Sequence, residues 1–156
     1  MTWQLFIRHA HRDTSFEESD NGLSLKGHRQ GQALIDYLKA LDPPRRPKAI
    51  YSSPKLRCVE TAQFVADWLG IELQIALGLD EQDHSSENSV DFQKRIKNCL
   101  SDFGGQSELA FVSHGDVLPL ILSFLGAEPG EIKKGNLFIC ANGRIEHLNG
   151  VTSSGN

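Results

Sequence analysis

The feature that most constrains the fold of this chain of 156 residues is its alternation of strand-like and helix-like segments. Short apolar runs bounded by turn residues are typical of strands, and longer segments with apolar residues at helical spacing follow them. The expected strands are WQLFIR (3–8), KAIYSS (48–53), ELQIAL (72–77) and LAFVSH (109–114). The expected helices lie within 24–41, 54–70, 92–103 and 116–126.

This order predicts a three-layer α/β/α sandwich with a mostly parallel sheet, because right-handed crossovers place helices on both sheet faces. LAFVSH (109–114) is apolar almost throughout, which is typical of a buried central strand. The segment LFICANGRIEHL (137–148) differs, because Asn142-Gly143 between two short strand-like pieces predicts a C-terminal hairpin. We expect a single catalytic domain over 1–150 and a frayed tail over 151–156.

Polar residues set the expected starts of two helices. Ser24 is the expected N-cap of the first helix. Ser53 is the expected N-cap of the second helix, with Pro54 at its first position. Both residues therefore mark points where a loop turns into a helix.

Bulk properties exclude several classes of function. A net charge of -4 provides no electrostatic footprint for nucleic acid or a membrane surface, so neither is expected as a partner. The start MTWQLFIRH lacks the basic residues and cleavage site of a signal peptide, and no apolar run approaches the ~20 residues of a membrane span. Cys58, Cys99 and Cys140 are widely spaced among apolar neighbours, which predicts buried, reduced thiols in a cytoplasmic protein.

The ends of the expected strands carry the chemically active residues. In parallel α/β folds ligands bind beyond the carboxyl ends of the strands. Those ends carry Arg8-His9, Ser52-Ser53-Pro54, Leu79-Asp80-Glu81 and Ser113-His114-Gly115. Arg57 joins them from the first turn of the second helix. Two histidines, a carboxylate pair and two arginines are therefore expected at one edge of the sheet.

This set of residues suits phosphoryl transfer, which requires positioning and neutralisation of the phosphoryl oxygens. The guanidinium forks of Arg8 and Arg57 match phosphate geometry. Among such cations His9 stays neutral, as a nucleophile must, and His114 can act as a cationic clamp on the transferring group. A carboxyl group after the third strand can protonate the leaving oxygen.

A metal site is the rival interpretation of FIRHAHRD (6–13). On a strand, His9 and His11 share a face, and Asp13 follows at the same spacing. Arg8 and Arg12 flank the pair and oppose a dication. The barrel fold that typically carries such a pair runs to ~250 residues. A metal-dependent hydrolase is therefore the weaker alternative, with further ligands from His84, His114 or Asp116.

The motifs, taken together, resemble those of the histidine phosphatase superfamily, which includes cofactor-dependent phosphoglycerate mutases and short bacterial phosphohistidine phosphatases. The likeness runs from the first strand to at least residue 126. Five motifs occur in the family's order: FIRHA (6–10), LSLKGHRQGQAL (23–34), YSSPKLRCVETA (51–62), LDE (79–81) and VSHGDVL (112–118).

The resemblance implies a role for each matched residue. His9 is the implied nucleophile, the implied phosphate-binding residues are Arg8, Arg57 and His114, and Glu81 is the implied proton donor. Asp80 and Asp116 stay open as alternative donors, because some short family members lack an acid on this loop. The further candidate substrate-binding residues are Arg12, His11 and Ser15.

The expected activity is that of a metal-independent phosphatase without a cofactor. It hydrolyses phosphomonoesters or phosphohistidine through a phosphohistidine intermediate. Its substrate is a phosphorylated small molecule or a protein that bears phosphohistidine, and the short chain favours hydrolysis in an open site. A non-catalytic phosphate-binding module on the same fold is the main alternative, because fold alone does not guarantee activity.

Overall fold

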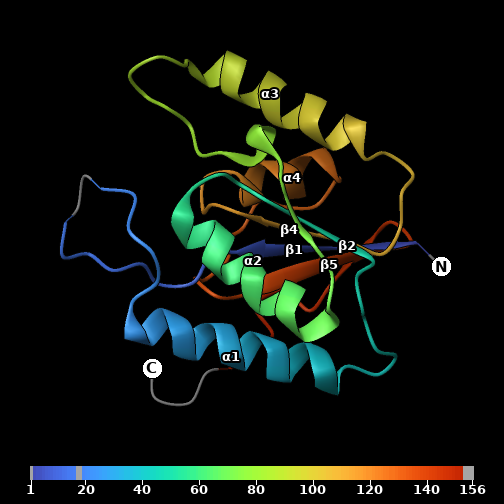
Figure 1. Ribbon diagram of the computed structural model, residues 1–156. Coiled ribbons are helices and arrows are strands. Elements are labelled where there is room, and N and C mark those ends of the chain that lie inside the picture. Colours follow the sequence, from blue (N-terminus) through green and yellow to red (C-terminus); the bar gives the residue numbers. More distant parts are fainter. Residues whose placement is uncertain (1, 17–18, 153–156) are drawn as a thin grey trace.

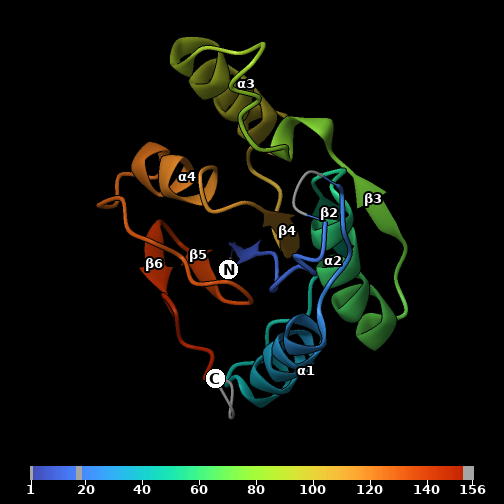
Figure 2. The same cartoon turned by 90° about the vertical axis from the view of Figure 1, so that its left-hand side faces the viewer.

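A computed structural model describes residues 2–16 and 19–152 of the chain. Within them, six strands form one sheet of order β3-β2-β4-β1-β5-β6 (Figures 1 and 2). The strands are β1 (Trp3–Arg8), β2 (Ala49–Ser52), β3 (Leu73–Ile75), β4 (Leu109–Ser113), β5 (Leu137–Ala141) and β6 (Arg144–Glu146). The helices are α1 (Leu25–Ala40), α2 (Leu56–Leu69), α3 (Ser89–Asp102) and α4 (Leu118–Phe124), with a 3-10 turn at Leu77–Leu79.

The sheet is mostly parallel, as predicted. β1 pairs in parallel with β4, and β2 pairs in parallel with both β4 and β3. β5 runs antiparallel to β1, and β6 completes the predicted C-terminal hairpin. Asn142 and Gly143 form its two-residue turn with φ of 51° and 78°, the left-handed conformation that this dipeptide favours.

Helices cover both faces of the sheet, with α1 and α2 on one side and α3 and α4 on the other (Figure 1). The alternation of side chains along β1 divides the core accordingly. Leu5 and Ile7 pack towards α1 and α2, whereas Phe6 packs towards α3 and α4. The Phe6 ring stacks on Phe111 of β4 and Phe138 of β5, with centroids 5.1 and 4.9 Å apart. The predicted α/β/α sandwich is confirmed.

Helix starts agree with the sequence at α1 but not at α2. The Ser24 hydroxyl accepts a hydrogen bond from Gly27 N (3.0 Å), so Ser24 is the N-cap as predicted. The prediction of Ser53 as the N-cap of α2 was wrong, because α2 begins two residues later with Lys55 as its N-cap. The hydroxyl of Ser53 instead lies 2.7 Å from a ring nitrogen of His114.

The end of the described chain is better ordered than the sequence indicated. Val151 was expected in a frayed tail, but it is buried in the core beside α1. Asn136, just before β5, holds it through hydrogen bonds from Asn136 Nδ2 to Val151 O (2.8 Å) and from Val151 N to Asn136 Oδ1 (3.1 Å). Residues 153–156 of the expected tail lie outside the described residues.

Cys58 and Cys99 are buried as predicted, Cys140 is half-buried, and all three thiols are free. In the part of the chain that the structure describes, no helix has the length and apolarity needed to cross a membrane.

Candidate active site

The parallel pairing of β1 with β4 places the two predicted histidines together. Arg8 is the register partner of Ser113, so His9 and His114 each follow the last residue of adjacent paired strands. The amide of His9 donates to the Ser113 carbonyl (3.0 Å), which continues the ladder one step further. The two rings meet edge to face with 5.4 Å between their centroids. The carboxyl end of the sheet therefore carries the site, as the sequence predicted.

His9 is held in a defined tautomer. Its Nδ1 lies 2.8 Å from the carbonyl oxygen of Ala10, and a carbonyl only accepts, so Nδ1 carries the hydrogen. Burial, together with the nearby charges of Arg57, Arg8 and Lys134, lowers the pKa of His9 from 6.5 to about 3, although the hydrogen bond with Ala10 O opposes the shift. The ring is therefore neutral near pH 7, and Nε2 keeps the free lone pair that a nucleophile requires.

His114 is fixed by two partners, Ser53 directly after β2 and Arg57 in the first turn of α2. The Arg57 guanidinium, which only donates, lies 3.4 Å from His114 Nδ1, so the ring hydrogen resides on Nε2 and points at Ser53 Oγ, 2.7 Å away. Burial and the charge of Arg57 lower the pKa of His114 to about 2. In this structure His114 is thus a neutral hydrogen-bond donor. Its role as a cationic clamp on the transferring group concerns the substrate complex and stays a prediction.

Arg57 connects the histidines to the acidic loop. Its Nη2 donates to Glu81 Oε2 at 2.8 Å. Glu60, one turn further along the same helix, is bonded elsewhere, because its Oε1 accepts from the amide of Leu23 (2.9 Å). Arg57 is about nine-tenths buried, so its charge acts at short range on His114 and Glu81.

The three candidate proton donors lie in different surroundings. Glu81 lines the cleft that contains His9. Asp80 is occupied by Lys55 Nζ (3.3 Å) and by Glu81 N (2.9 Å). Asp116 accepts from Gln82 N (3.0 Å), and burial raises its pKa. Neither aspartate lines the cleft, so the placement favours Glu81.

Arg8 is clamped at the end of β1. Its Nη1 donates to the carbonyl of Ile132 (2.7 Å), and its Nε is buried with no hydrogen-bond partner among the described residues. Gly115 lies against the guanidinium, since a Cβ at this position would come within 2.7 Å of Arg8 Cζ. A glycine after His114 is therefore needed for Arg8 to lie where it does.

These side chains line a cleft of about 480 Å³. Its lining residues are Arg8, His9, Arg12, Ser19, Asp20, Lys55, Arg57, Glu81 and Lys134. Of the candidate substrate-binding residues, only Arg12 lies here. Ser15 is exposed and donates to Asp13 Oδ1 through both its amide (2.9 Å) and its hydroxyl (2.6 Å), so the structure does not bring it to the site.

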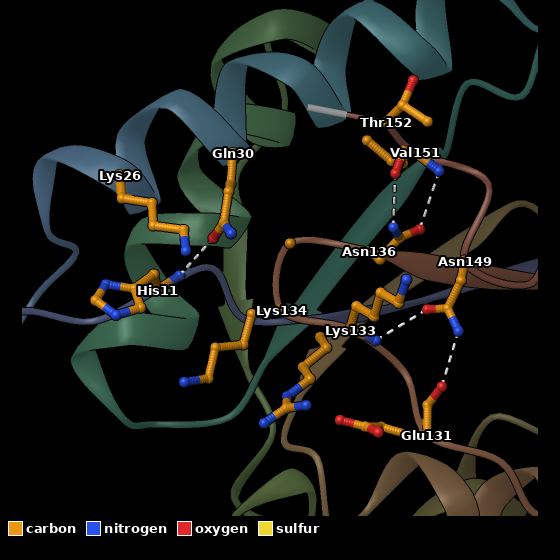
Figure 3. Close-up of a pocket in the computed structure, with 12 residues that line it drawn as sticks. His11, Lys26, Gln30, Glu131, Lys133, Lys134, Asn136, Asn149, Val151 and Thr152 are labelled. Carbon is orange, nitrogen blue, oxygen red and sulfur yellow. Dashed lines mark hydrogen bonds between the residues drawn. The ribbon is translucent and has the colours of Figure 1, made fainter. Parts of the chain in front are cut away.

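His11 also lies away from the His9 cleft. It lines a neighbouring cleft (Figure 3). Its Nδ1 is 2.7 Å from Ser24 Oγ. Among the described residues, no group of three or more His, Cys, Asp or Glu side chains is arranged to hold a metal ion. The residues proposed for the alternative metal site, His9, His11 and Asp13, are therefore not brought together.

Besides Ser19 and Asp20 of the cleft lining, the sequence reasoning missed three residues of the site. Lys134 lies in the loop before β5, and the amide of Gly135 beside it donates to the carbonyls of Arg8 (3.2 Å) and His9 (3.1 Å). Because β5 is antiparallel to β1, its amino end reaches the same sheet edge as the carboxyl ends of the parallel strands. Lys55 and Ser53, the other two, had been interpreted as part of the start of a helix.

Comparison with known proteins identifies the family of this chain. The family model of the histidine phosphatase superfamily (branch 1) matches residues 5–86, just over half of the chain. The chain belongs to this superfamily. A curated relative, the 55 kDa subunit of transcription factor tau from Saccharomyces cerevisiae, is 38% identical over 64 residues, which cover 41% of this chain. The match spans only 14% of that relative's length.

Solved structures share the fold over nearly the whole chain. The phosphoserine phosphatase of Entamoeba histolytica in complex with 3-phosphoglyceric acid has a TM-score of 0.71 and 20% identity, over 89% of this chain and 90% of that one. A mycobacterial glucosyl-3-phosphoglycerate phosphatase with inorganic phosphate has a TM-score of 0.75 and 16% identity, over 96% and 97% of the two chains. At these identities the likeness shows the fold.

Proposed function

We propose that this protein is a metal-independent phosphatase that hydrolyses phosphomonoesters or phosphohistidine through a covalent phosphohistidine on His9. One observation carries the proposal. A neutral histidine, with its hydrogen fixed on Nδ1 by Ala10 O, lies in a cleft lined by cationic side chains. The cations in question are Arg8, Arg12, Lys55, Arg57 and Lys134.

In the first step, His9 Nε2 attacks phosphorus in line with the leaving oxygen. The new N–P bond forms as the bond from phosphorus to the leaving oxygen breaks. The charge on the non-bridging oxygens is stabilised by the guanidinium groups of Arg8 and Arg57. His114 also donates to them, with its Nε2–H released from Ser53 Oγ when the phosphoryl group binds. Burial of the two histidines strengthens each of these interactions, because water competes less for the phosphoryl group.

Glu81 supplies the proton for the leaving oxygen. The support for this role is that Glu81 lines the cleft of His9 and that its Oε2 lies 2.8 Å from Arg57 Nη2. In the second step the Glu81 carboxylate accepts a proton from the attacking water, the N–P bond breaks, and neutral His9 is restored. The two solved structures named above belong to phosphatases, which supports hydrolysis of a phosphate ester.

A non-catalytic phosphate-binding module is the second candidate. One observation favours it, since the curated relative with 38% identity over 64 residues is a subunit of a transcription factor. Such a module needs the arginines of the cleft but makes no use of a nucleophile or a proton donor. The two candidates therefore differ in turnover rather than in phosphate binding.

Hydrolysis of para-nitrophenyl phosphate in EDTA tests the proposal. The proposed enzyme keeps its full rate in EDTA and loses it in His9→Ala, while Asp13→Asn, a substitution in the rival metal set, has no effect. A binding module shows no turnover above background but retains affinity for inorganic phosphate. Loss of activity in EDTA that zinc or magnesium restores would contradict the proposal.

A further inference from the structure

A second cleft, of about 650 Å³, lies next to the one that contains His9 (Figure 3). It lies between the first turns of α1, the loop before β5 and the segment that follows β6. Lys26 and Gln30 come from α1, Glu131, Lys133 and Lys134 from the loop, and Asn149 from the last segment. The proposed reaction on His9 uses none of the residues that belong to this cleft alone.

The two clefts adjoin each other, because Arg8 and Lys134 line both of them. The junction is rigidly built. Arg8 Nη1 is held by Ile132 O (2.7 Å), and the backbone of Gly135 is bonded to the carbonyls of Arg8 and His9. Gly135 has a φ of 71°, and a Cβ there would come within 2.8 Å of Gln30 Cβ, so the loop packs directly against α1. An anionic group in one cleft would therefore lie close to a group bound in the other, with Arg8 beside both.

The second cleft is strongly cationic. Lys26, Lys133 and Lys134 line it together with Arg8, against the single carboxylate of Glu131. None of the three lysines forms an ion pair with a residue that the structure describes, whereas exposed Lys48 and half-buried Lys55 both do. Burial and the charges of Arg8, Arg12 and Lys26 lower the pKa of Lys134, as expected where cations gather without a counter-charge.

Hydrogen bonds brace the walls of the cleft. The Asn149 side chain accepts from Lys133 N (2.9 Å) and donates to Glu131 O (2.8 Å), and buried Asn136 bonds both polar backbone groups of Val151. Gln30 Oε1 accepts from His11 N (2.8 Å). These contacts fix the backbones that carry the lysines, so little ordering of the chain is needed when an anion binds.

We propose that this second cleft, the Lys26–Lys133–Lys134 cleft, binds a second anionic group of the substrate, a carboxylate or a phosphate, while the phosphoryl group to be removed lies at His9. The inference rests on the proposed function, because it assigns a substrate class to that site. Arg8 lies between the two anions and contributes to both. The preferred substrates are therefore small phosphomonoesters with a second negative charge at the far end of a short linker.

A matched series of substrates tests this. Alkyl phosphates with linkers of increasing length are compared in three forms, with a terminal hydroxyl, a terminal carboxylate or a terminal phosphate. We expect kcat/KM to be at least about tenfold higher for one anionic form at its best linker length than for the hydroxyl form, with a preference that declines in high salt. The carboxylate and phosphate arms identify which anion the cleft takes.

Charge variants locate the effect. Lys26→Gln and Lys133→Gln should each reduce the preference several-fold and leave kcat/KM for the hydroxyl form unchanged, since both lysines line the second cleft alone. Glu131→Gln should increase the preference. Lys97, at an exposed position of α3, serves as the control. Lys97→Gln removes the same charge on the opposite side of the sheet from α1 and should change neither the preference nor kcat/KM for the hydroxyl form.

Binding measurements separate the failure of this inference from the failure of the proposed function. The His9→Ala variant is titrated calorimetrically with the same three forms. Preferential binding of an anionic form that Lys26→Gln weakens supports the second subsite even if the wild type shows no turnover. If the wild type turns over all three forms with equal kcat/KM and the variant binds them with equal affinity, the second subsite is contradicted. The proposed phosphatase activity is not affected by that result. A preference that Lys26→Gln and Lys133→Gln leave intact contradicts it as well.

Discussion

The rings of His9 and His114 meet edge to face, 5.4 Å apart, one residue beyond the ends of two hydrogen-bonded parallel strands. Arg57 contacts the His114 side of this pair and bonds Glu81, so groups from four separate segments converge on one edge of the sheet. Both histidines are neutral because they are buried among fixed cations. This relationship makes specific predictions for stability and for catalysis.

The first prediction concerns stability at acid pH. The pKa of His114 is lowered to about 2, whereas the unfolded chain takes up a proton at this position below about 6.5. Because the unfolded state then binds more protons than the folded state, stability falls as pH decreases below 6.5, by up to about 1.4 kcal/mol per pH unit for this group. His9 behaves in the same way down to its pKa of about 3.

His114→Asn removes one of these two contributions. Its free energy of unfolding, measured in urea between pH 6.5 and 4.5, should decline less steeply than that of the wild type. At pH 7.5 the variant should be the less stable protein, because the hydrogen bond to Ser53 and buried packing are changed. Parallel pH dependences for the two proteins would contradict a neutral, buried His114.

A second prediction concerns the proton donor. Glu81→Gln should lower kcat/KM by about 10²–10⁴ for alkyl phosphates, whose leaving oxygen needs a proton. The loss should be less than about tenfold for para-nitrophenyl phosphate, because nitrophenolate leaves without one. Asp80→Asn and Asp116→Asn serve as matched controls and should affect both substrates to a similar, small extent. If Asp116→Asn instead lost activity with alkyl phosphates but kept it with para-nitrophenyl phosphate, Asp116 would be the proton donor.

A third prediction concerns the position of Arg8. In Gly115→Ala the new methyl group would lie 2.7 Å from Arg8 Cζ, so the guanidinium has to move. A misplaced phosphate-binding group should reduce kcat/KM by about 10- to 100-fold. Gly130→Ala is the matched control, because a Cβ at Gly130 meets no atom within 4 Å. Equal activity of both variants, with similar Tm, would show that Arg8 does not bind the phosphoryl group.

The sheet and the centre of the candidate site could be predicted from the sequence. Arg8, His9 and His114 directly follow apolar runs that are unmistakable as strands, and the carboxyl ends of parallel strands meet at one edge. Glu81 was placed by the same rule, although the 3-10 turn at Leu77–Leu79 lies between β3 and the acid. Local sequence patterns were therefore sufficient to place a functional side chain wherever it directly follows a strand.

The remaining residues depend on long-range packing that local patterns do not encode. Lys134 reaches the site because β5 is antiparallel to β1, a pairing that only the folded sheet reveals. Ser53 directly before Pro54 has the local pattern of an N-cap, yet its hydroxyl makes its shorter contact with His114, 61 residues away. Ser15 was assigned to the substrate but bonds Asp13 nearby in the chain. The roles of these residues depend on contacts in the folded chain that their neighbours in the sequence do not indicate.

The central claim is that His9 forms a covalent bond to phosphorus, and trapping the phosphoenzyme tests it most directly. The wild type is mixed with a phosphomonoester labelled with radioactive phosphorus, quenched in alkali within one turnover, and mapped by peptide mass spectrometry. We predict a phosphoryl group on Nε2 of His9 that survives alkali, is lost in acid and is absent in His9→Ala. A His9→Ala protein that hydrolyses the ester at the wild-type rate, or a label on another residue, would contradict the account.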